Sequence, residues 1–137
     1  NKLGYIDWLK IALGASAGVM NLHASNLVHR DIACRNVLLR KDLTSAVADL
    51  GLALSLPANQ TTATDNENSP LPLVTTAPET WDRGEYSPKS DVFMFGMLLY
   101  EMFARCEPFH DCVLWQTDYS AFRRQVSTSS LRPTLPS

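Results

Sequence analysis

Polar side chains that could carry chemistry gather in two short stretches of the 137-residue chain. Residues 29–36 read His-Arg-Asp-Ile-Ala-Cys-Arg-Asn, and thirteen residues after Asn36 comes Asp49, followed by Leu and Gly. A carboxylate can accept or orient the proton of an attacking hydroxyl group. Carboxylate and amide oxygens are also the ligands that Mg²⁺ prefers in proteins. The two stretches therefore hold the residue types that a reaction assisted by a hard cation would need.

The elements around these stretches follow from hydrophobic spacing and turn residues. Apolar residues three and four apart predict a helix over 5–24, with one face formed by Ile6, Leu9, Leu13, Ala17 and Met20. Residues 27–28 then form a short extended piece. Residues 37–39 and 46–48 are expected to pair as a β-hairpin. The hairpin would bring Asn36 and Asp49 to the same end.

The composition changes abruptly over 54–76, where Asn, Gln, Thr, Ser and Pro dominate and Lys, Arg and aromatic residues are absent. Such a stretch is typical of disorder or of a long functional loop. A short helix is expected over 77–81, and Ser87 is expected to cap a helix that runs to about Ala104. That helix is apolar on nearly every side, so we expect it to be buried all round. A weaker helix is predicted over 113–126.

Composition excludes several classes of protein. Apolar residues make up 45% of the chain and charged residues 19%, which excludes a disordered or supercharged protein. The net charge of −2 gives no basic field, so no nucleic-acid partner is expected. The longest apolar run, 92–100, is shorter than the roughly 20 residues that span a bilayer, so no membrane segment is expected. Three cysteines without metal-ligand spacing favour a reducing compartment.

Four motifs together resemble the eukaryotic protein kinases. They are the stretch 29–36, Asp-Leu-Gly at 49–51, Ala-Pro-Glu at 77–79, and the helix start at 91–96. One such motif would be weak, but these four follow the order and spacing of the family. The resemblance implies an α+β protein-kinase-like fold, of which this chain is the mainly α-helical C-terminal lobe with a short β-hairpin.

The resemblance also sets the expected domain organisation. Residues 1–137 would be a partial protein kinase domain that lacks the N-terminal lobe and the last helices, and 54–76 would be its activation-segment loop. The glycine-rich loop and lysine that bind ATP would lie outside the chain, so we expect the chain by itself to be inactive.

Site roles carry over from the family residue by residue. Asp31 matches the catalytic base, while Asn36 and Asp49 match the ligands of the Mg²⁺ that accompanies ATP. Arg35 matches a residue that contacts the transferred phosphate and organises the catalytic loop. Leu38 matches the floor of the adenine pocket. The cofactors implied are ATP and Mg²⁺, and the partner implied is a protein substrate.

Six other positions match residues with regulatory or structural roles: His29, Arg30, Leu50, Gly51, Glu79 and Asp91. His29 and Leu50 match an apolar column, and Arg30 matches the arginine that pairs with a phosphorylated activation loop. Asp91 matches a carboxylate that binds the catalytic-loop backbone. Glu79 matches a glutamate whose arginine partner comes from helices beyond this chain.

Tyrosine is the favoured acceptor. Serine/threonine kinases have a lysine where this chain has Ala33, whereas tyrosine kinases resemble this chain in placing Arg35 two residues later. Val74 and Thr75, however, stand where tyrosine kinases usually have Lys and Trp, so a serine/threonine or dual-specificity kinase stays open. The enzyme is expected in the cytoplasm, either as a soluble protein or as the cytoplasmic part of a membrane receptor.

A second alternative is a pseudokinase, an interaction module without turnover. Leu50 in place of the usual Phe supports it, as does an activation segment that contains no tyrosine. The retention of Asp31, Asn36 and Asp49 opposes it. Cys34, between the catalytic positions, is expected to be a packing residue, with a reactive thiol as the alternative.

Overall fold

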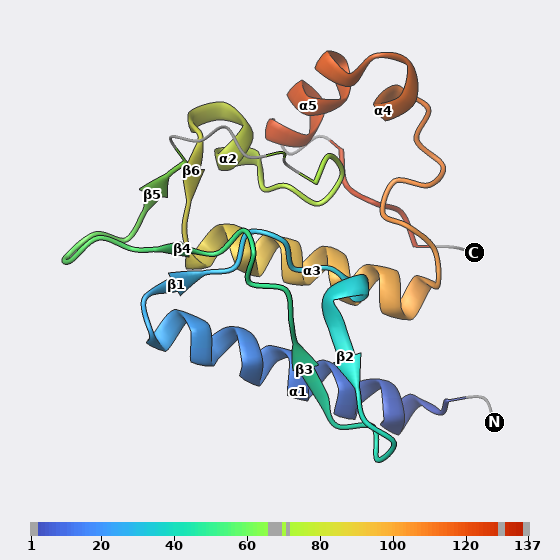
Figure 1. Cartoon of the computed structure of the whole chain (residues 1–137). Coiled ribbons are helices and arrows are strands. Elements are labelled where there is room, and N and C mark those ends of the chain that lie inside the picture. The colour runs from blue at the N-terminus through green and yellow to red at the C-terminus, as the bar shows by residue number, and fades with distance from the viewer. Residues whose placement is uncertain (1–2, 66–69, 71, 129–130, 136–137) are drawn as a thin grey trace.

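The computed structural model describes residues 3–65, 70, 72–128 and 131–135. The helices are α1 (Tyr5–Ala24), α2 (Pro78–Arg83), α3 (Pro88–Ala104), α4 (Leu114–Thr117) and α5 (Tyr119–Ser127), with the 3-10 turn η1 (Cys34–Asn36). The strands are β1 (Leu27–Val28), β2 (Val37–Leu39), β3 (Ser45–Val47), β4 (Leu54–Ser55), β5 (Ala63–Thr64) and β6 (Glu85–Tyr86). They form three antiparallel pairs, β1–β4, β2–β3 and β5–β6. In Figure 1, α3 lies between α1 on one side and α2, α4 and α5 on the other.

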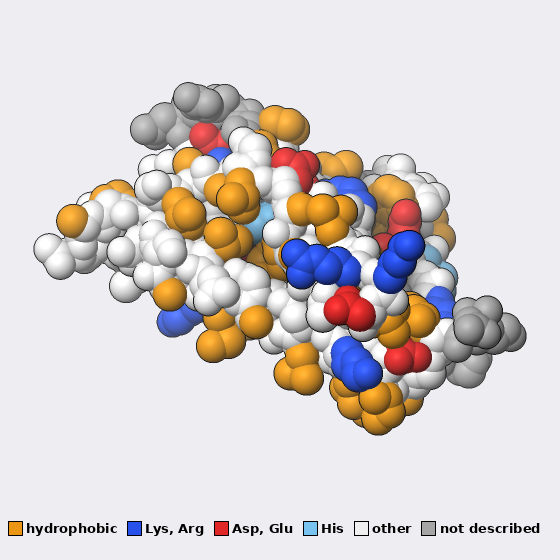
Figure 2. All heavy atoms as spheres, turned by 60° about the horizontal axis from the view of Figure 1, so that its bottom comes forward, with side chains coloured by type: hydrophobic (Ala, Val, Ile, Leu, Met, Phe, Trp, Pro, Cys, Tyr) orange, Lys and Arg blue, Asp and Glu red, His pale blue; other side chains and the backbone are white. Residues whose placement is uncertain are grey.

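The first helix has the predicted bounds, and the apolar face that the spacing indicates lies at the surface. Leu13 and Met20 are 68% and 69% exposed, whereas Ile11, Ala15 and Val19 are buried. Both faces carry apolar residues at helical spacing, so periodicity alone does not distinguish them. The glycines of the helix, at 14 and 18, lie on the buried side and let β3 approach closely. In Figure 2 the side of the molecule that lies at the bottom of Figure 1, where α1 is, comes forward. Hydrophobic side chains are visible on this surface.

The predicted β-hairpin forms, one residue earlier in its second strand than expected. Val37 lies opposite Val47, and Leu39 lies opposite Ser45. The hairpin packs on α1, where the Ser45 hydroxyl donates a hydrogen bond of 2.7 Å to the Ile11 carbonyl oxygen. This contact fixes the hairpin on the helix and thereby fixes the residues at its open end.

The third helix begins where it was predicted and connects two hydrophobic clusters. Ser87 and Ser90 form a capping box at its start. One side joins α1 in a cluster made of Ile11, Val19, Ile32, Met94, Leu98 and Met102. The other side joins α5 in a cluster made of Met97, Phe109, Phe122 and Val126. The helix is not buried all round, however, because Val92 and Phe103 are 61% and 44% exposed.

The expected loop at 54–76 contains secondary structure. The strand β4 pairs with β1, and β5 pairs with β6. Residues 54–55 and 63–64 of this segment are therefore hydrogen-bonded to strands outside it. The positions 66–69 and 71 lie outside the described residues.

The helix predicted over 113–126 is divided in two. Asp118 ends α4 and caps α5, with its Oδ1 accepting a hydrogen bond of 2.9 Å from the Ala121 N–H. Aspartate favours an N-cap over a helix interior because its side chain satisfies an unpaired amide. The Arg123 guanidinium on α5 donates a hydrogen bond to the Trp81 carbonyl oxygen on α2.

Candidate functional site

Two strand pairs bring the polar stretches of the sequence together. Val28 of β1 lies opposite Leu54 of β4, so the residues that follow β1 lie beside those that precede β4. At the open end of the hairpin, the Ala48 N–H donates a hydrogen bond of 2.8 Å to the Asn36 carbonyl oxygen. These pairings place the loop 29–36 next to the turn 49–51, as the sequence predicted.

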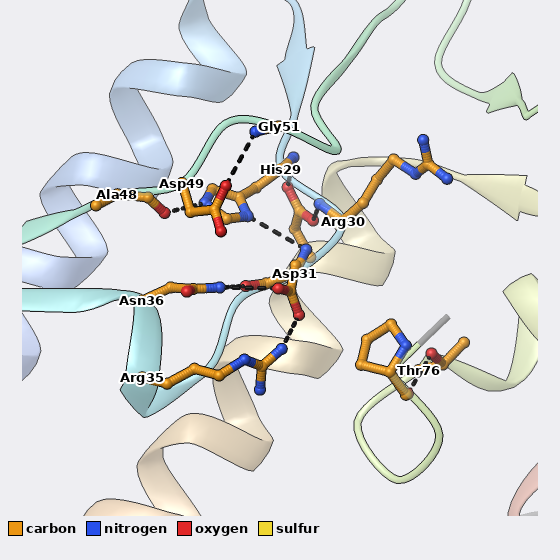
Figure 3. A network of polar contacts seen from close by, with 11 residues as sticks. His29, Arg30, Asp31, Arg35, Asn36, Ala48, Asp49, Gly51 and Thr76 are labelled. Carbon is orange, nitrogen blue, oxygen red and sulfur yellow. Dashed lines mark hydrogen bonds and ion pairs between the residues drawn. The ribbon is translucent and has the colours of Figure 1, made fainter. Parts of the chain in front are cut away.

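The Asp31 carboxylate is held by two residues of its own loop. Arg35 forms an ion pair with Oδ1, and the Asn36 side-chain amide donates to Oδ2 at 2.9 Å (Figure 3). The same amide donates to the Asp31 carbonyl oxygen at 2.7 Å. The turn η1 makes these contacts possible because it returns the chain toward Asp31. With 14% of its side chain exposed, Asp31 is oriented yet still open to solvent.

Asn36 and Asp49 present oxygen atoms of the kind a hard cation requires. The Nδ2 of Asn36 is engaged by Asp31, so Oδ1 is the atom left for a ligand. Asp49 is exposed, and its Oδ1 accepts the Gly51 N–H at 3.2 Å. Figure 3 shows both side chains extending from the hairpin end toward the region of Asp31. This pair of one carboxylate and one amide oxygen fits a Mg²⁺ site.

His29 connects the two stretches through its ring. Its side chain is fully buried, and Nε2 lies 3.0 Å from the Ala48 carbonyl oxygen. The Asp31 N–H donates to Nδ1 at 3.2 Å. These partners assign the ring proton to Nε2, because a carbonyl only accepts and an N–H only donates. The backbone of the proposed base is thus oriented by a buried imidazole.

Asp91, at the start of α3, binds the backbone of the loop 29–36. Its Oδ2 accepts the His29 N–H at 2.8 Å, and its Oδ1 accepts the Arg30 N–H at 2.9 Å. Oδ2 also lies 2.8 Å from Nε2 of His23, on α1. The carboxylate is fully buried, and hydrogen bonds from these groups stabilise it inside the fold.

The Arg30 side chain is buried and makes contacts that sequence reasoning did not foresee. Its guanidinium pairs with Asp65, donates to the Leu52 carbonyl oxygen at 3.1 Å and lies 4.2 Å from the ring centroid of Tyr86. The family resemblance implies a phosphate as the partner of Arg30, whereas the structure places the Asp65 carboxylate there. The sequence does hint at such a pair, because 54–76 contains two acidic residues that need a cation from elsewhere and no basic residue of its own.

The other predicted positions lie at the edges of this arrangement. Leu38 is 61% exposed on β2, which leaves an apolar surface available to a ligand. Leu50 is 49% exposed, whereas His29 is fully buried. The apolar column that the resemblance implies for these two residues stays a prediction.

Glu79 lies away from Asp31, in the first turn of α2. It lines a cavity of about 410 Å³ together with Arg83 and Lys89. Among the described residues, Glu79 has no hydrogen-bond or ion-pair partner within 4.0 Å.

Cys34 is a packing residue and not an activated thiol. It lies against the cluster between α1 and α3, and its thiol donates to the Leu98 carbonyl oxygen at 3.6 Å. Burial, followed by the nearby Glu101 carboxylate, raises the pKa of the thiol from 9.0 to about 12. The thiol therefore stays protonated at neutral pH.

Comparison with known proteins decides the family. The family described as "Protein tyrosine and serine/threonine kinase" matches residues 1–129. The chain belongs to this protein kinase family. The kinase fragment is 41% identical over 99 residues to human protein-tyrosine kinase 6, a match covering 72% of the chain and 21% of that protein. It is 42% identical over 96 residues to the megakaryocyte-associated tyrosine-protein kinase of Mus musculus, covering 70% of the chain and 18% of that protein.

A third relative extends over more of the chain. The dual specificity protein kinase shkE of Dictyostelium discoideum is 31% identical over 129 residues, which cover 93% of the chain and 18% of that protein. The chain thus spans about a fifth of the length of these curated relatives. Within the part that the structure describes, no helix is long and apolar enough to cross a membrane. No group of three or more His, Cys, Asp and Glu side chains in that part is arranged to hold a metal ion.

Proposed function

We propose that the whole protein is an enzyme that transfers the γ-phosphate of ATP to tyrosine residues of a protein substrate. The observation that carries this proposal is the Asp31 carboxylate, which Arg35 and Asn36 orient from within one loop. A group held in this way can align a hydroxyl for attack without reorganising during the reaction.

Each residue of the site has a distinct task in this proposal. Asp31 orients the acceptor hydroxyl and takes its proton. Arg35 neutralises charge beside it and keeps the carboxylate turned toward the acceptor. Asn36 and Asp49 would hold the Mg²⁺ that neutralises the phosphate oxygens of ATP. Leu38 offers the exposed apolar surface on which the adenine ring would lie.

The test is label transfer from γ-labelled ATP by the full-length protein. Asp31→Asn should lower kcat by about 10²–10⁴-fold, because it removes the proton acceptor while keeping a similar shape. Asp42→Asn is the matched control, since Asp42 is exposed in the hairpin turn and its amide would still accept from Thr44. Absence of transfer by the wild-type protein with Mg²⁺ and ATP would favour the pseudokinase alternative instead.

The acceptor specificity has a second candidate. Similarity to a dual specificity kinase covers more of the chain than similarity to the tyrosine kinases does. Val74 packs against the α3–α5 cluster and Thr75 is buried, so neither residue offers a charged or aromatic platform to a tyrosine ring. Peptides that differ only in a Tyr, Ser or Thr acceptor separate the two candidates. Transfer to tyrosine alone supports our proposal, whereas comparable transfer to serine or threonine supports dual specificity.

The compartment we propose is the cytoplasm. The three cysteines, at 34, 106 and 112, are free thiols in the structure, which suits a reducing environment. Non-reducing mass spectrometry of the protein isolated from cells tests this point, because a disulfide among these residues would contradict it.

A further inference from the structure

The Arg30 guanidinium connects four segments of the chain. Beyond its own loop, it reaches the turn before β4 through Leu52, the segment after β5 through Asp65, and β6 through the Tyr86 ring. The side chains of Arg30 and Asp65 are only 3% and 8% exposed. A buried cation is strongly unfavourable without a partner, so the arrangement depends on the Asp65 carboxylate.

A strand pair places Asp65 at this position. Ala63 lies opposite Tyr86 and Thr64 lies opposite Glu85, and Asp65 follows directly. The same two strands thus supply both the anion that pairs with the guanidinium and the aromatic ring on which it lies. Charge pairing and a cation–π contact act together on one buried group.

The Arg30 backbone links this pair to the proposed base. Arg30 has a φ of 73°, a left-handed conformation that is costly for a residue with a Cβ. Its N–H is bound by Asp91, and the following N–H, that of Asp31, is bound by His29. A guanidinium that left its buried place would pull on this strained peptide and so displace Asp31.

We propose that Asp65 is a positioning residue that holds the catalytic loop through Arg30, so that Arg30 is kept in place without phosphorylation. The inference rests on the proposed phosphoryl transfer and deepens it to the control of the same site. Two observations support it: the Asp65 carboxylate already pairs with the Arg30 guanidinium, and the segment 54–76 contains neither a tyrosine nor a Lys or Arg that could pair with a phosphate.

The first experiment compares Asp65→Asn, Asp65→Glu and the control Asp42→Asn in the full-length protein. Asp65→Asn should lower kcat by at least about tenfold, with smaller changes in KM, because Asp31 is displaced while the binding surfaces remain. Asp65→Glu should restore kcat to within about threefold, since it restores the charge. Wild-type kcat in Asp65→Asn, or no rescue by Asp65→Glu, would overturn the proposal.

The second experiment removes phosphate from the wild-type protein with a phosphatase. The kcat should change by less than about twofold, because the carboxylate and not a phosphate holds Arg30. Loss of activity on this treatment would overturn the proposal even if Asp65→Asn were inactive. This arm is also decisive if Asp65→Asn fails to fold.

Hydrogen exchange separates a failure of this inference from a failure of the proposed function. In the full-length protein, Asp65→Asn should speed exchange at the amides of Arg30 and Asp31, and Asp65→Glu should not. A wild-type protein without transfer activity would contradict the proposed function and leave this measurement valid. Unchanged exchange in Asp65→Asn would contradict the role of Asp65.

Discussion

Gly14 on α1 lies so close to Ser45 on β3 that a Cβ added at Gly14 would stand 2.3 Å from the Ser45 Oγ and 3.1 Å from its carbonyl oxygen. Gly14→Ala should therefore destabilise the protein by about 1–3 kcal/mol, because the hairpin must move away from the helix. The measurement is the free energy of unfolding in urea.

Gly96 on α3 is the matched control. A Cβ there would meet no atom within 4 Å, so Gly96→Ala should be neutral or stabilise by up to about 1 kcal/mol through helix propensity. Equal effects of the two substitutions would mean that the approach of β3 to α1 is not as close as described.

Asp91→Asn should destabilise the protein by about 3 kcal/mol. The carboxylate accepts from two backbone amides and from His23, and an amide would turn a donor toward at least one of these donors. Urea unfolding measures the change. Asp118→Asn is the control, since asparagine caps α5 nearly as well as aspartate and should shift stability by less than about 0.5 kcal/mol.

Cys34 should resist alkylation in the folded protein. Its pKa of about 12, against an ordinary 9.0, makes the thiolate fraction at pH 8 about a thousandfold smaller than in the unfolded chain. We expect modification by iodoacetamide, followed by mass spectrometry, to be at least tenfold slower in buffer than in urea. Equal rates would show that the thiol is not buried.

Because the pKa of Cys34 is raised in the folded protein, the free energy of unfolding should fall as the pH rises. Between about 9 and 12 the unfolded chain loses the Cys34 proton while the folded protein keeps it. The contribution of this group to stability is therefore complete below pH 9 and is lost as the pH rises toward 12. In Cys34→Ala, this part of the decline should disappear.

Arg35→Ala should separate stability from turnover. The Arg35 side chain is 59% exposed, and an exposed ion pair contributes only about 0.5 kcal/mol. Turnover in the full-length protein should fall by at least about tenfold, because Asp31 loses one of the two residues that orient it. Arg40→Ala, in the exposed hairpin turn, should leave both quantities unchanged.

Local patterns were sufficient to predict much of this fold. Helical spacing and the Ser87 cap predicted α1 and α3, and two short apolar runs on either side of a polar turn predicted the β2–β3 hairpin. The buried face of α1 could not be predicted in this way, because both faces are apolar and the choice depends on contacts with β3. The break at Asp118 was missed because a capping residue outweighed the helical pattern on either side of it.

In the candidate site, too, local contacts were predictable and contacts between distant segments were not. The proximity of Asp31, Asn36 and Asp49 was predictable, since a short loop and a hairpin join them. The pair between Arg30 and Asp65 was not, because the segment 54–76 lacks periodicity and its position depends on the pairing of β5 with β6. Contacts between segments distant in sequence leave little trace in either segment alone.

The buried carboxylate of Asp91 has a consequence for synthesis on the ribosome. It binds the amides of His29 and Arg30, which leave the exit tunnel some sixty residues before it does. Loop closure over that distance cannot occur until α3 has been made. The nascent loop 29–36 therefore lacks its hydrogen bonds to Asp91 during this interval, and a pause in translation before α3 would prolong that state.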